Sequence, residues 1–121
     1  MTICGLKRVL TGGLVLLTLL APALMAHAIL LEASPAKNGS VTGPDFKIHL
    51  KYNSRIDASR SQISLLLPDK TVRTLTIEKQ ASPEMLTAQA AGMKAGIYHL
   101  RWQVLASDGH ITRGEYPFEV K

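Results

Sequence analysis

Apolar and polar side chains alternate with a period of two along most of the chain that follows residue 27. The alternation is clearest from Phe46 to Tyr52, and it recurs from Ile97 to Leu105 and from Gly114 to Val120. A period of two places successive side chains on opposite faces of a strand. Each of these segments is therefore predicted to be a strand with one buried face.

Shorter apolar segments complete the predicted set of strands. Ala28 to Ala33 is predicted to be the first strand, and Thr87 to Ala90 a short later one. Gln62 to Leu67 and Thr71 to Ile77 flank the turn-forming residues Pro68-Asp69-Lys70, so they are predicted to form a hairpin. About seven short strands favour an all-β fold, a small Ig-like or Greek-key β-sandwich or barrel.

Three side chains in the predicted strands could be mistaken for ligands. His49 and His99 alternate with apolar neighbours and fall on the polar faces of their strands, so we expect them to face solvent. Trp102 alternates with Leu100 and Val104 and is expected to be a core aromatic residue. None of the three is assigned to a site.

The N-terminal segment has the features of a secretory signal peptide. Lys7 and Arg8 precede an apolar run from Val9 to Leu20. This run is shorter than the roughly 20 residues of a transmembrane helix, so we expect export and a mature chain that does not span the membrane. The small-residue rule allows cleavage after Ala26, which leaves a histidine first, or after Ala28, which removes it.

Cleavage after Ala26 divides the chain into a signal peptide, residues 1–26, and one small domain, residues 27–121. Removing Lys7 and Arg8 leaves 12 of the 14 basic residues against 9 acidic ones, so the net charge falls from +5 to +3. The remaining basic residues are scattered, and nucleic acid is therefore not an expected partner.

Cysteine usage limits how the exported domain is stabilised and which metals it could bind. The one cysteine, Cys4, lies in the signal segment, so the domain has no disulfide. A bound metal would have nitrogen and oxygen ligands, with methionine sulfur as the one soft alternative.

Asp108 and His110 interrupt the apolar pattern between the last two predicted strands. Two residues apart in an extended segment, their side chains leave the same face, and Gly109 lets the backbone bend. A carboxylate and an imidazole would then converge on one point. The alternative is a polar turn in which Asp108 accepts backbone hydrogen bonds and His110 is solvated. Adjacent Ser107 does not favour a hydrolase, because residues this close cannot form a nucleophile, a base and an orienting group.

Several segments of the exported domain form a recognisable set: Ala26-His27-Ala28, Ala33-Ser34-Pro35-Ala36 with Gly39, Gly96-Ile97-Tyr98 with Arg101-Trp102-Gln103-Val104, and Ser107-Asp108-Gly109-His110 with Gly114 and Phe118. In these segments the chain resembles the bacterial periplasmic copper-resistance family called CopC, which includes YobA-like members. The resemblance covers essentially the whole exported domain. Members are typically cut immediately before a histidine, which favours cleavage after Ala26.

The resemblance implies a Cu(II) site made from the N-terminal amine and imidazole of His27, the imidazole of His110 and the carboxylate of Asp108. This set of nitrogen and oxygen donors suits Cu(II). The implied function is non-enzymatic copper sequestration, or delivery to a CopD-like inner-membrane copper transporter, by a monomeric periplasmic protein.

Two departures from the family pattern bear on the site. Some members bind Cu(I) through a methionine-rich loop, whereas only Met85 and Met93 remain here, so no dedicated Cu(I) site is expected. Some members also place an acidic residue near copper where this chain has Asn53-Ser54.

Two other classes of function remain open at this point. Histidine-brace copper oxidases and oxygenases also use an N-terminal histidine with a second histidine, although a 95-residue domain leaves little room for a substrate surface. A metal-free Ig-like adhesion or assembly module would follow if cleavage after Ala28 removed His27. All three hypotheses depend on where the mature chain begins.

Overall fold

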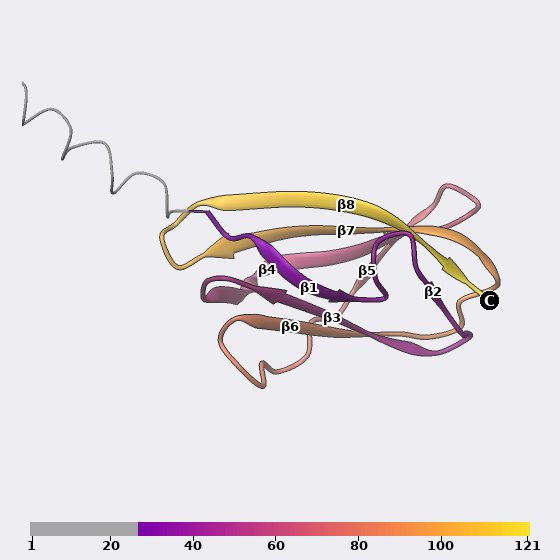
Figure 1. Ribbon diagram of the computed structural model, residues 1–121, viewed down its shortest axis with the longest axis horizontal. Helices are drawn as coiled ribbons and strands as arrows, with labels where there is room; N and C mark the ends of the chain where they lie inside the picture. The colour runs from indigo at the N-terminus through magenta and orange to yellow at the C-terminus, as the bar shows by residue number, and fades with distance from the viewer. Residues whose placement is uncertain (1–26) are drawn as a thin grey trace, which may run out of the picture.

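The computed structural model describes residues 27–121. Within them, eight β-strands form two packed sheets (Figure 1). The predicted signal peptide, Cys4 and the residues before the cleavage point lie outside the described residues. One sheet has the order β1-β3-β6 and the other has the order β2-β8-β7-β4-β5. The strands are β1 (Leu30–Ser34), β2 (Ser40–Val41), β3 (Phe46–Tyr52), β4 (Ile56–Leu66), β5 (Val72–Leu75), β6 (Met85–Ala90), β7 (Gly96–Ala106) and β8 (Ile111–Val120).

The predicted all-β sandwich is confirmed, and the departures from it have local causes. β2 was not predicted because it has only two residues, which pair in parallel with the end of β8. β4 starts at Ile56, earlier than expected, because polar residues obscure its first half. Its pairing with β7 is irregular between Asp57 and Gln62. There, the Ser61 hydroxyl donates to the Asp57 carbonyl at 2.7 Å and accepts from the Leu105 amide at 3.1 Å.

The core lies between the inward faces of the two sheets. Along β3 the buried and exposed residues alternate without interruption, as the sequence predicted. The Phe118 ring packs 5.8 Å from the rings of both Phe46 and Tyr98, measured between centroids. Burying a large apolar side chain of this kind contributes about 1.5–3 kcal/mol to folding.

The three side chains set aside from the site lie where the sequence predicted or close to it. Trp102 is partly buried against the core, and its indole covers Gly114 of the neighbouring strand. His49 is exposed on β3, and His99 is half-buried on β7.

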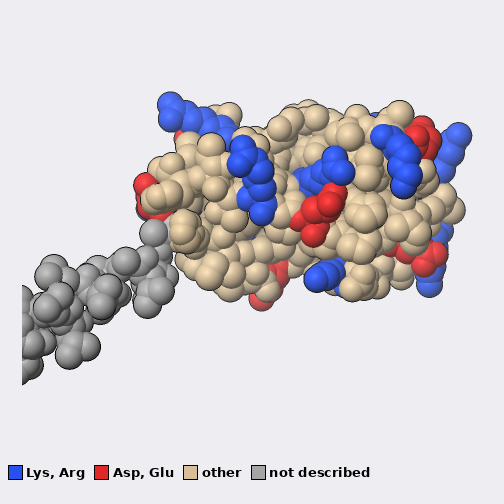
Figure 2. Space-filling view, turned by 90° about the horizontal axis from the view of Figure 1, so that it is seen from above, with Lys and Arg blue, Asp and Glu red and all other residues tan. Residues whose placement is uncertain are grey.

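The start of the described chain lies at the end of the sandwich that carries the β7–β8 loop (Figure 1). β1 begins beside the β7–β8 loop, and the C-terminus lies at the opposite end (Figure 1). Lys and Arg side chains are dispersed over the face seen in Figure 2, with acidic side chains among them. Within residues 27–121 there is no helix long and apolar enough to cross a membrane.

Candidate metal centre

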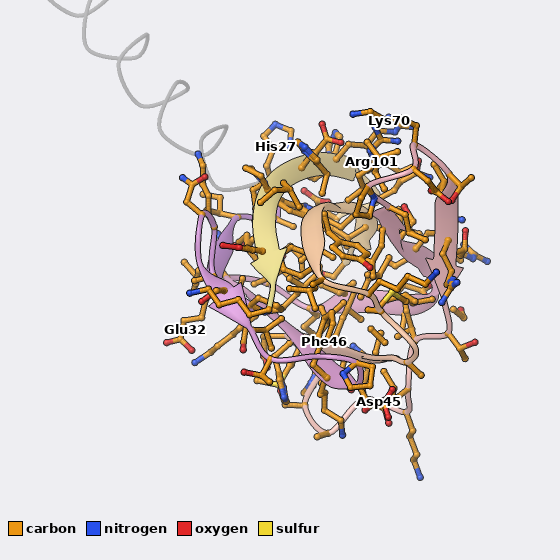
Figure 3. The ribbon with its side chains drawn as sticks, turned by 90° about the vertical axis from the view of Figure 1, so that its right-hand side faces the viewer. His27, Glu32, Asp45, Phe46, Lys70 and Arg101 are labelled. Carbon is orange, nitrogen blue, oxygen red and sulfur yellow. The ribbon has the colours of Figure 1, made fainter. Side chains whose placement is uncertain are left out.

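His27 and His110, which are far apart in sequence, meet at this end of the sandwich. The centroids of their rings lie 5.3 Å apart, with an angle of 71° between the ring planes. Both residues are exposed to solvent. Figure 3 shows His27 at the edge of the molecule, whereas Phe46 lies nearer the middle of the view. The structure therefore places two imidazoles side by side on an accessible surface.

The β7–β8 loop brings Asp108 to His110 through a turn. Gly109 has a φ of +87°, and its amide donates to the Ala106 carbonyl at 3.0 Å. Asp108 Oδ1 accepts a hydrogen bond from the His110 backbone at 2.9 Å, and Asp108 Oδ2 lies 3.1 Å from His110 Nδ1. The two side chains converge as expected, but the expectation of an extended segment was wrong. The backbone hydrogen bond is the one anticipated for a polar turn.

The same contacts determine the charge on Asp108. The hydrogen bond from the His110 backbone, followed by smaller contributions from the side chains of His110 and His27, lowers the pKa of the Asp108 carboxyl. Because the ordinary pKa of a carboxyl is already near 4, Asp108 is ionised at neutral pH. A negative charge therefore lies beside the two imidazoles.

Side chains alone do not complete a metal site in the described structure. Within residues 27–121, no three His, Cys, Asp or Glu side chains are grouped so that they could hold an ion. The further donor that the sequence suggested is the nitrogen of His27. That atom is a poor ligand while it belongs to a peptide bond with Ala26, and it becomes an amine when the bond is cut. The donor set thus fits Cu(II) only in the processed chain.

The loop between β3 and β4 contacts both segments that carry these donors, through residues next to them in sequence. The Ile29 amide donates to Asn53 Oδ1 at 2.7 Å, and the Asn53 amide donates to the Ile29 carbonyl at 3.0 Å. Two residues further along, the Arg55 carbonyl accepts from the Ser107 amide at 3.0 Å. Sequence reasoning noted Asn53 only as a departure from the family pattern. An asparagine after a strand is typical of a turn and carries no signal of such a contact.

The two methionines that remain after the predicted cleavage, Met85 and Met93, are both at least partly buried. Met93 is buried in the core with 2% of its surface exposed, and Met85 is partly buried at the start of β6. The Met93 sulfur lies 4.0 Å from an Arg73 guanidinium nitrogen. Met93 therefore serves the packing of the core.

Comparisons with known proteins identify similar chains over nearly the whole length. The model of the CopC domain matches residues 30–121, a range that includes Asp108 and His110 and begins three residues after His27. Protein YobA of Escherichia coli strain K12 is 32% identical over 119 residues, covering 94% of this chain and 96% of the relative. Copper resistance protein C of Escherichia coli is 27% identical over 124 residues, covering 95% and 96%.

A solved structure agrees with the fold. The crystal structure of CopC from Methylosinus trichosporium OB3b superposes with a TM-score of 0.73 at 31% sequence identity. The superposition covers 78% of this chain and 94% of that chain.

Proposed function

This chain belongs to the CopC family, as its sequence resemblance predicted, and from that premise we propose that it is a copper-binding protein that binds Cu(II). The observation that carries the proposal is the 5.3 Å separation between the ring centroids of His27 and His110, with the Asp108 carboxylate 3.1 Å from His110 Nδ1. The relatives named for copper resistance support the choice of copper.

The proposed ligands are the amine and imidazole of His27, the imidazole of His110 and the carboxylate of Asp108. The amine and ring of one histidine bind as a chelate, so ordering that residue once supplies two donors. Three nitrogens and one oxygen match the tetragonal coordination that Cu(II) prefers, and the carboxylate offsets part of the charge of the ion. Binding must displace a proton from the amine, whose ordinary pKa is about 7.7–8.0.

The proposal requires export and one particular cleavage. Residues 1–26 would act as a signal peptide and be removed after Ala26, releasing residues 27–121 into the periplasm with His27 first. Cleavage after Ala28 would remove both nitrogens of His27. The processed protein would then sequester Cu(II), or pass it to a CopD-like inner-membrane transporter, without catalysing a reaction.

The experiment compares three processed forms in a Cu(II) titration against a competing chelator. One form starts at His27, one starts at Ile29, and one carries His27→Ala and so keeps the amine but loses the ring. We expect one tight Cu(II) per chain in the first form only, and the intact mass of the exported protein should correspond to a His27 start. Absence of a stoichiometric site in the His27 form would refute the proposal. Oxygen or peroxide turnover by the copper-loaded form would replace it with a histidine-brace oxidase.

A further inference from the structure

The three-residue loop Asn53–Arg55, between β3 and β4, connects the two segments that carry the proposed ligands. Its first residue is hydrogen-bonded to Ile29, two residues after His27. Its last residue is hydrogen-bonded to Ser107, which directly precedes Asp108. The two ligand-bearing segments belong to different sheets, since β1 lies in the three-stranded sheet and the β7–β8 hairpin lies in the five-stranded one. The loop is therefore a direct link across the end of the sandwich.

The N-terminal segment has few other restraints at this point. The pairing of β1 with β3 starts at Leu30 and is irregular between Leu30 and Glu32. The Ile29 side chain is 58% exposed, so its own packing does little to hold the backbone. Ala28 is buried and anchors the segment from the other side. The two hydrogen bonds of Asn53 extend the β1–β3 pairing to the residue before the ladder.

One of these two bonds depends on the Asn53 side chain. Its acceptor is Oδ1, at 2.7 Å from the Ile29 amide, so an alanine would lose it and an aspartate would keep it. The neighbouring Ser54 provides a matched comparison. Its hydroxyl has no hydrogen-bond partner among the residues that the structure describes. Removing the Ser54 hydroxyl should therefore leave the hydrogen bonds between this loop and Ile29 unchanged.

We propose that Asn53 is a positioning residue that holds the processed N-terminus so that His27 faces His110. The inference rests on the proposed Cu(II) site and assigns Asn53 a role through the backbone of Ile29, without contact with the metal. Residues outside the ligand shell that orient ligands typically change metal affinity by about 10–100-fold when mutated. Asn53→Ala should therefore weaken Cu(II) binding by the processed protein about tenfold. Ser54→Ala should leave the affinity unchanged.

A second comparison separates positioning from general loss of structure. In a His110→Ala background there is no second imidazole to face, so Asn53→Ala should no longer affect the affinity of the remaining His27 chelate. An equal loss in both backgrounds, or wild-type affinity for Asn53→Ala, would overturn the inference.

Hydrogen exchange of the metal-free protein supplies a readout that does not depend on copper. The Ile29 amide should exchange faster in Asn53→Ala than in the wild type or Ser54→Ala, while the core amides of β3 and β7 remain equally protected. Unchanged protection of Ile29 would refute the positioning role even if wild-type protein bound no copper. Failure of the wild type to bind Cu(II), by contrast, would refute the proposed function. The role of Asn53 in holding the Ile29 backbone would then be tested by the hydrogen exchange of the Ile29 amide alone.

Discussion

The ring of His27 lies edge-on to the ring of His110, with 5.3 Å between the centroids and 71° between the planes. The first residue belongs to the segment before β1 and the second to the loop between β7 and β8. Neither ring is buried, so their approach is set by the backbones that carry them. Because side-chain rotation at exposed positions is fast, both rings can turn their nitrogens toward one ion without any strand moving.

Replacing His110 with alanine should weaken Cu(II) binding by the processed protein about a hundredfold or more, since loss of a direct ligand should exceed the 10–100-fold effect of outer-shell changes. His49→Ala is the matched control, because it removes an exposed imidazole from the other sheet. Competition titration with a chromophoric chelator measures both. Equal affinities for the two variants would contradict the assignment of His110.

The affinity for Cu(II) should fall as the pH is lowered from 8 to 6. An α-amine has an ordinary pKa of about 7.7–8.0, so protons compete with copper for it over this range. The pKa of Asp108 is lowered, which keeps its carboxylate ionised throughout. Asp108→Asn should therefore weaken binding at every pH while leaving the slope of log Kd against pH unchanged. A flatter slope for Asp108→Asn would show that Asp108 titrates with the nitrogen donors.

Tyr116→Phe should destabilise the fold more than Tyr52→Phe, although both remove a hydroxyl from a buried tyrosine. Tyr116 donates to the Pro35 carbonyl at 2.6 Å, and losing that bond leaves a buried carbonyl unpaired, at a cost of about 1–3 kcal/mol. The Tyr52 hydroxyl has no hydrogen-bond partner within residues 27–121, so its removal should be neutral or slightly stabilising. Urea unfolding of the metal-free domain tests the difference, and equal losses would argue against it.

Gly114→Ala should also destabilise the domain, by about 1–3 kcal/mol, because a Cβ at this position would overlap the indole of Trp102. The same substitution made in a Trp102→Ala background should cost much less, since the clash is gone. A double-mutant cycle on unfolding free energies measures this coupling. Additive losses would mean that Gly114 is needed for a reason other than Trp102.

By itself, the sequence determined the class of fold, the boundaries of β3 and the identities of the three candidate ligands. Alternation within a strand is a local property, because consecutive side chains point to opposite faces. It can be recognised in the sequence wherever one face of the strand is buried. Polar residues at Asp57 and Ser61 hid the first half of β4, where a serine hydroxyl takes the place of regular pairing. His27, Asp108 and His110 were identified from a cleavage signal, a short motif and a family resemblance.

Only the tertiary structure decided how those residues stand relative to one another. The proximity of His27 to His110 depends on the end of the sandwich at which β1 starts, and the convergence of Asp108 with His110 depends on a turn instead of a strand. The contact of Asn53 with Ile29 depends on the pairing of β1 with β3. The contacts of His27 with His110 and of Asn53 with Ile29 join segments distant in sequence. Which segments meet is determined by how whole sheets pair and pack, and no local pattern of side chains specifies this.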